Sequence, residues 1–194
     1  MNLKLIKKYI SKYTTNDEEL EVVIYGLYNF ILSVCGIFLS VLLGIITRKT
    51  FEVIIFLLFF IPLRIFAGGY HARSTKRCMI LSSLVMVGVI FMYQIKDSIS
   101  THLEYMNSIE VVLFVIACII IYILAPVDNE NKRLYIHEIK RYRMITRIIV
   151  FGYTFLFFVS KGQDNQIYYT ILISVIFESM SLISGKTKDY ISSK

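Results

Sequence analysis

Long apolar runs separated by short charged segments dominate the pattern of this chain. A helix that crosses a bilayer needs about 20 mostly apolar residues, with a range of about 17 to 25. The first run has no charged residue over 26 positions, whereas the fifth begins beside Arg147 and the sixth contains Glu178. The last two runs are also compatible with one hairpin that does not fully cross. The predicted spans cover residues 22–47, 53–70, 79–95, 111–127, 144–160 and 166–185.

Residues 1–20 show a different pattern, with apolar residues at helical spacing and lysines between them. Such a pattern is typical of a basic amphipathic helix that lies on a membrane surface. A solvated arm ahead of the first span is the alternative. The segment has no uninterrupted apolar core and no small-residue cleavage site, so we do not expect a cleavable signal peptide.

Composition supports a membrane protein. Hydrophobic residues make up 56% of the chain and charged residues 18%, and the mean hydropathy is +0.64. A soluble domain normally carries about a quarter charged residues. No repeat, linker or second domain is visible. We therefore predict an all-α, polytopic integral membrane protein with about six transmembrane helices in one domain over residues 1–194.

Lys and Arg are distributed unevenly between the two sides of the predicted bundle. With the N-terminus in the cytoplasm, 17 of the 21 Lys and Arg residues fall on the cytoplasmic side. Cytoplasmic loops carry the basic excess in membrane proteins. We therefore expect a multi-pass protein of the cell membrane, with both termini and the segment between the second and third spans in the cytoplasm.

That segment, LRIFAGGYHARSTKRCMIL, contains the strongest candidates for chemistry. The cytoplasm is reducing, so Cys78 should persist as a free thiol, and the basic neighbours Lys76 and Arg77 should favour the nucleophilic thiolate. His71 is the first candidate for a general base, because it is the only histidine of the segment. His137 lies in another cytoplasmic loop and is a candidate third member.

The spacing of His71 and Cys78 sets a geometric condition. Seven residues separate them, which corresponds to about 10 Å along a straight helix. A hydrogen bond of about 3 Å is then out of reach. If the two residues act together, the chain must bend between the second and third spans. Gly68 and Gly69 supply a backbone that can break the helix just before His71.

The residues alone leave three interpretations of the pair open: catalysis, two ligands of a metal site, or no shared role. The metal interpretation is the weaker one, because a structural zinc takes four ligands and no second Cys/His cluster lies on the same side. Cys35 and Cys118 lie inside apolar runs, and we expect them to be small buried hydrophobic residues.

Arg64 lies inside the second predicted span, where a charge is costly and usually faces protein or water. Three roles are open for its guanidinium. It can hold a substrate carboxylate, pair with Glu178 or Glu52, or extend to the membrane interface.

The pattern R-x3-G-G-x-H-x6-C, which begins at Arg64, resembles the accessory gene regulator protein B (AgrB) family of membrane cysteine endopeptidases. The segment APVDNENK, residues 125–132, resembles an Ala-Pro-Val-Asp segment of that family. Arg133 is a departure, because many relatives have proline there. Length, basic loops and number of spans also agree, so the resemblance covers essentially the whole chain.

The resemblance implies a thiol protease of bacterial quorum sensing that processes an AgrD-like propeptide into an autoinducing peptide. Cys78 would be the nucleophile and His71 the base. The cysteine would cleave before the C-terminal tail, and the acyl-enzyme thioester would close to a thiolactone or lactone. Residues expected to support catalysis or bind substrate are Arg64, Gly68, Gly69, Arg73, Lys76 and Arg77.

The expected partners are the AgrD-like propeptide and the lipid bilayer. The resemblance also implies homodimers, although the sequence shows no dimer signal of its own. We expect no cofactor, no metal and no nucleic-acid partner. The basic stretch NKRLYIHEIKRYRMITR is a candidate contact for the acidic propeptide tail or for anionic lipid, and ordinary cytoplasmic charge explains it equally well.

A different class of function stays open beside the enzyme. The chain can be a non-enzymatic membrane adaptor or exporter component for a small peptide. The glycine-rich segment would then be a structural re-entrant loop.

Overall fold

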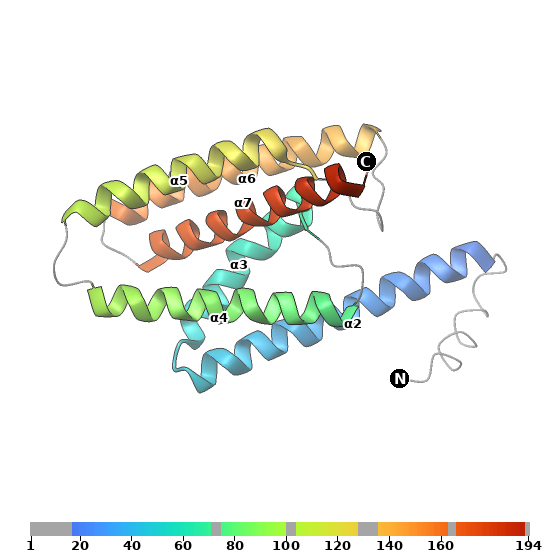
Figure 1. The fold of residues 1–194 in the computed structure, drawn as a ribbon, viewed down its shortest axis with the longest axis horizontal. Coiled ribbons are helices and arrows are strands. Elements are labelled where there is room, and N and C mark those ends of the chain that lie inside the picture. Colours follow the sequence, from blue (N-terminus) through green and yellow to red (C-terminus); the bar gives the residue numbers. More distant parts are fainter. Residues whose placement is uncertain (1–16, 71–74, 100–103, 128–135, 163–165, 193–194) are drawn as a thin grey trace. The chain divides into compact units, whose positions relative to one another are not determined.

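A computed structural model of the chain describes residues 17–70, 75–99, 104–127, 136–162 and 166–192 (Figure 1). Helices account for nearly all of these residues, which confirms the predicted all-α fold, and each predicted span overlaps one helix. Most of the predicted amphipathic arm, residues 1–16, lies outside the described part. The helices are α2 Asp17–Ile46, α3 Thr50–Ala67, α4 Thr75–Ile99, α5 Glu104–Leu124, α6 Ile136–Gly162 and α7 Gln166–Ser192.

Four stretches of the described part are long and apolar enough to cross a bilayer: Thr50–Ala67, Cys78–Lys96, His137–Gly162 and Gln166–Lys188. The apolar stretches Phe30–Ile46 and Ser108–Leu124 are shorter. Helices suit the bilayer because each backbone N–H and C=O finds its partner within the same segment. Length and composition therefore identify an all-α membrane protein.

The chain separates into two compact units, Met1–Ser40 and Val41–Lys194. In the first unit, α2 exposes the large apolar side chains of Phe30 and Phe38. Cys35 is exposed too, so the expectation that it is buried is wrong. The reason is physical: lipid tails are as apolar as a protein core, so a residue in an apolar run need not contact protein. Cys118, in the second unit, is partly buried.

Helix α7 is the centre of the second unit. It packs against α3, α5 and α6, and 56% of its apolar stretch is buried, against 22% for each of the other three candidate spans. Rings of α5 and α6 stack beside it, with the centroids of Phe114 and Phe157 3.9 Å apart. The innermost residues of this core include Leu63, Phe114, Ile121, Phe157, Ile171, Val175 and Leu182.

A second cluster joins α4 to α3 and α7. Met86, Val89 and Ile90 of α4 pack with Val53 and Phe56 of α3. A hydrogen bond also joins α4 to α7, because the hydroxyl groups of Tyr93 in α4 and Thr170 in α7 lie 2.5 Å apart. Helix α7 therefore contacts both α3 and α4, the two helices that flank the candidate catalytic segment.

Candidate functional site

The expected break in the second span is present. Helix α3 ends at Ala67, and Gly68 and Gly69 follow with φ of +80° and +115°. L-residues that carry a side chain rarely adopt these φ values, so glycine is needed at both positions. Residues 64–81 therefore do not form one straight helix, because the chain leaves the helical conformation at Gly68 and Gly69. The structure describes α4 from Thr75, and His71 lies outside the described residues.

The turn formed by residues 68–70 is held from one side by the chain after α5. Gly68 forms an isolated parallel bridge with Val127, and the Val127 N–H donates to the Ala67 carbonyl over 3.0 Å. A Cβ added at Gly68 would collide with the Val127 carbonyl oxygen. Val127 belongs to the APVDNENK segment, so the structure brings together two segments that carry the family resemblance.

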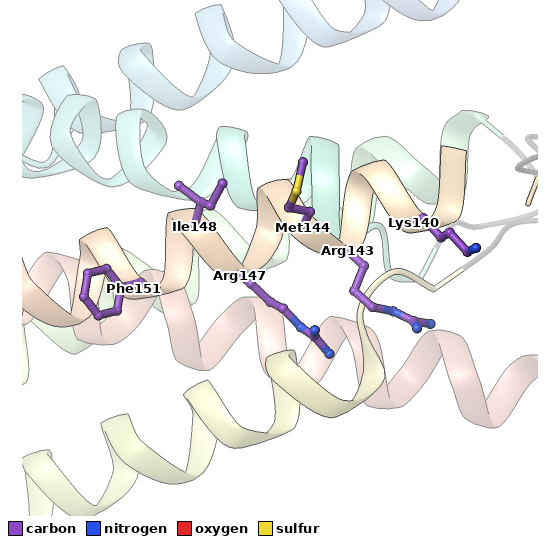
Figure 2. Close-up of a pocket in the computed structure, with 6 residues that line it drawn as sticks. All are labelled: Lys140, Arg143, Met144, Arg147, Ile148 and Phe151. Carbon is purple, nitrogen blue, oxygen red and sulfur yellow. The ribbon is translucent and has the colours of Figure 1, made fainter. Parts of the chain in front are cut away.

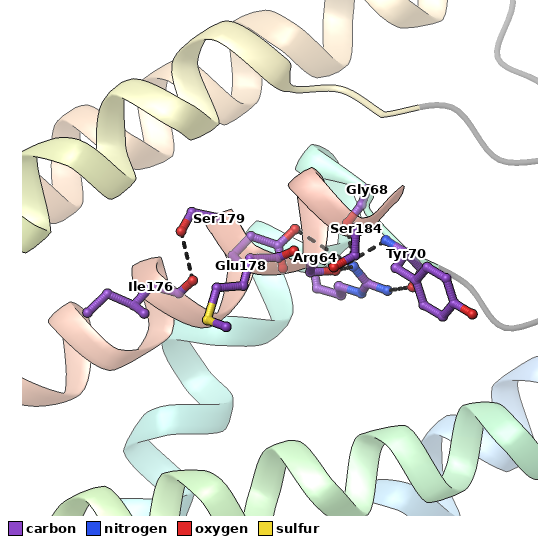
Figure 3. Close-up of polar contacts among 9 residues, drawn as sticks. Arg64, Gly68, Tyr70, Ile176, Glu178, Ser179 and Ser184 are labelled. Atoms are coloured by element: carbon purple, nitrogen blue, oxygen red, sulfur yellow. Dashed lines mark hydrogen bonds and ion pairs between the residues drawn. The ribbon is translucent and has the colours of Figure 1, made fainter. Parts of the chain in front are cut away.

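The Arg64 side chain forms hydrogen bonds with the same turn (Figure 3). Its Nη1 donates to the Gly68 carbonyl over 2.7 Å and to Ser181 Oγ, and its Nη2 donates to the Tyr70 carbonyl. Nη1 also lies 4.0 Å from Oε1 of Glu178. Of the pairings left open by the sequence, Glu178 is the partner, while Glu52 pairs with Lys49 over 3.1 Å.

Helix α7 completes the enclosure of the turn. The Tyr70 N–H donates to the Ser181 carbonyl over 3.0 Å and to Ser181 Oγ over 3.2 Å. Gly185 lets the backbones approach, because a Cβ there would lie 3.0 Å from both Gly69 C and Tyr70 N. Ser181 and Gly185 were not singled out by the sequence, which carries no signal for contacts between residues more than 100 positions apart.

Cys78 lies in the first turn of α4, which begins at Thr75. Its thiol is free and partly exposed, and its carbonyl accepts a hydrogen bond of 3.0 Å from Ser82 Oγ. The positive end of a helix favours an anion such as a thiolate at this position. The remaining predicted site residues, His71 and Arg73 and the side chains of Lys76 and Arg77, lie outside the described part.

A basic and apolar face of α6 lines an open hollow of about 490 Å³ (Figure 2). Its cations come from the stretch suggested above for tail or lipid contact, and the Arg147 guanidinium also lies 4.2 Å from the Tyr122 ring centroid. His137, at the start of the same helix, is exposed. The hollow is lined by Lys140, Arg143, Met144, Arg147, Ile148 and Phe151.

Comparison with known sequences identifies relatives over most of the chain. The family described as Accessory gene regulator B matches residues 3–182. "Putative AgrB-like protein 2" of Clostridium perfringens (strain 13 / Type A) is 30% identical over 130 residues, which cover 66% of this chain and 61% of the relative. "Putative AgrB-like protein" of strain SM101 is 29% identical over the same shares. The match thus spans less than two thirds of these relatives. No solved structure matches the chain significantly.

Proposed function

Because the chain belongs to the accessory gene regulator B family, we propose that it is a membrane cysteine endopeptidase that removes the C-terminal tail of a quorum-sensing propeptide. Family membership supports a part in quorum-sensing peptide processing, and the protease chemistry is our proposal. The observation that carries it is the broken helix. A fixed glycine turn leads directly to His71, and Cys78 stands in the first turn of the next helix.

His71, Cys78 and the substrate supply every group that the proposed cleavage needs. His71 takes the proton of the Cys78 thiol, and Sγ adds to the carbonyl carbon before the propeptide tail. The C–N bond breaks, and His71 returns the proton to the leaving amine. A thioester between Cys78 and the N-terminal part of the substrate remains.

Ring closure then follows by acyl exchange. A Cys thiol or Ser hydroxyl of the substrate adds to the thioester carbonyl, the C–S bond breaks, and the Cys78 thiol is regenerated. The thioester conserves the acyl energy, so no ATP is needed as long as water is kept from the intermediate. The product is a thiolactone or a lactone, according to the attacking atom.

The basic face of α6 is a suitable contact for the substrate. An acidic tail would be attracted by Lys140, Arg143 and Arg147, which share an exposed face with Met144 and Ile148. Anionic lipid would be attracted by the same cations.

The enzyme proposal is tested by co-expressing the chain with a candidate AgrD-like propeptide. Mass spectrometry of the cells should show a propeptide fragment that lacks its tail, and only when the chain is present. An adaptor or exporter would move the peptide without changing its mass. Detection of only the full-length propeptide inside and outside the cells would therefore favour the adaptor over the enzyme.

We further propose a bacterial cell-membrane location with both termini and the catalytic segment in the cytoplasm. The test uses single cysteines at His102→Cys and His137→Cys in a background without native cysteines. A membrane-impermeant maleimide added to intact cells should label position 102 and leave position 137 unlabelled until the cells are opened. Labelling of position 137 alone in intact cells would reverse the orientation.

A further inference from the structure

One stripe of α7 faces the glycine turn. Glu178, Ser181 and Gly185 are spaced by three and four residues, the spacing that places side chains on one face of a helix. All three contact the turn or its anchor Arg64. This stripe is distinct from the residues that carry the proposed chemistry, which lie before and within α4.

Ser181 joins the two donors that fix the turn. Its Oγ accepts hydrogen bonds from Arg64 Nη1 and from the Tyr70 N–H, the latter over 3.2 Å. The Tyr70 carbonyl accepts from Arg64 Nη2. Both backbone polar groups of Tyr70 are therefore held, and the Tyr70 carbonyl carbon is the atom to which the His71 nitrogen is bonded.

Glu178 places a buried carboxyl group beside Arg64. The residue has no exposed surface, and neither of its oxygens has a hydrogen-bond partner in the part of the chain that the structure describes. The Glu178 Oε1 atom lies 4.0 Å from Arg64 Nη1. Burying a carboxyl group without hydrogen bonds is costly, so its charge partner has to stay close. The Glu178 carboxyl group thereby holds the Arg64 guanidinium next to the turn, where its N–H groups donate to the Gly68 and Tyr70 carbonyls.

We propose that Glu178 and Ser181 are positioning residues. Through Arg64 they fix the backbone orientation of Tyr70, and this orientation sets where the next residue, His71, is placed. The inference rests on the proposed function, because it assigns these residues to the setting of the catalytic base. A displaced base lowers the rate steeply, since a misplacement of about 1 Å can cost on the order of 10²-fold.

The test measures the reactivity of Cys78 directly and needs no substrate. Full-length protein with Cys35→Ala and Cys118→Ala is purified in detergent, and the rate of Cys78 alkylation by iodoacetamide is measured at pH 7. His71→Ala defines the rate without the base. Ser181→Ala should lower the rate about tenfold, to near that reference, because one charge-assisted hydrogen bond is lost. Ser181→Thr, which keeps the hydroxyl, should restore it.

Two matched controls separate positioning from general damage. Ser184 lies one turn further along α7, is exposed, and donates a hydrogen bond of 2.9 Å to the Met180 carbonyl of its own helix. Ser184→Ala should leave the rate unchanged. Glu178→Gln should slow alkylation, whereas Glu110→Gln should not. Glu110 is also a buried carboxyl group, but it pairs with Lys161 over 2.9 Å, away from the turn.

The outcomes distinguish the two proposals. If His71→Ala slows alkylation while Ser181→Ala and Glu178→Gln both react at the parent rate, the dyad stands and the positioning inference is wrong. If His71→Ala itself has no effect, both the dyad and the inference are overturned. Thermal unfolding of each variant is recorded, and Ser181→Ala, at a partly exposed position, keeps the test valid if Glu178→Gln does not fold.

Discussion

Cys78→Ala is expected to abolish release of the propeptide tail. Removal of a catalytic nucleophile lowers turnover by a factor on the order of 10³ or more, because no acyl-enzyme can form. His71→Ala should come close to this loss, since the thiol then has no positioned base. The measurement is the amount of tail-free fragment in cells that co-express each variant with the propeptide, at matched levels of membrane protein.

The chain supplies its own controls for this prediction. Cys35→Ala and Cys118→Ala should process the propeptide normally, because these thiols belong to α2 and α5 and not to the segment that carries His71 and Cys78. Cys78→Ser should be severely impaired, because a serine hydroxyl does not ionise near neutral pH. Tail-free product from both Cys78→Ala and His71→Ala would rule out the proposed protease.

The helices and the break between them follow from local properties of the sequence. Charge-free apolar runs are long enough to cross a bilayer, and a helix is the structure that satisfies their backbone there. Two adjacent glycines before His71 mark a point where a helix can end, and α3 does end at Ala67. Both features could be predicted because each depends on residues close together in the chain.

The surroundings of Arg64 show where prediction from the sequence stops. The Arg64 charge lies inside a predicted span and was expected to pair or to reach the interface, and Glu178 was one of several candidate partners. The choice among them depends on how α3 and α7 face one another, which the sequence pattern does not encode. Ser181 and Val127 are ordinary residues in an apolar helix and a loop, and only the packing of distant elements brings them to the turn.

Cys35 illustrates a second limit. In a soluble protein an apolar run indicates burial, because the alternative is exposure to water. In a membrane protein the alternative is lipid, so an apolar run does not reveal which side of the helix meets protein. The exposed Cys35 and the fully buried Glu178 both depart from the soluble rule.

Gly69→Ala is expected to reduce tail release by about 10²-fold or more, which is the scale of loss for a misplaced catalytic group. Two causes act together at this position. The φ of +115° is unfavourable for any residue with a side chain, and an added Cβ would collide with Arg64 Nη1 and Ser181 Oγ. The turn has to shift, and Arg64 has to release at least one of the contacts that orient the chain before His71. Tail release is measured as for Cys78.

The matched control is Gly152→Ala in α6, where an added Cβ would meet no atom within 4 Å. Alanine also has the higher helix propensity there, so this variant should fold at least as well and process normally. Gly185→Ala should lie between the two, because its Cβ would come within 3.0 Å of Tyr70 N without imposing an unfavourable φ. Equal tail release by Gly69→Ala and Gly152→Ala would show that the shape of the turn does not control the reaction. A loss confined to Gly69→Ala and Gly185→Ala would instead tie catalysis to the contact between the turn and α7.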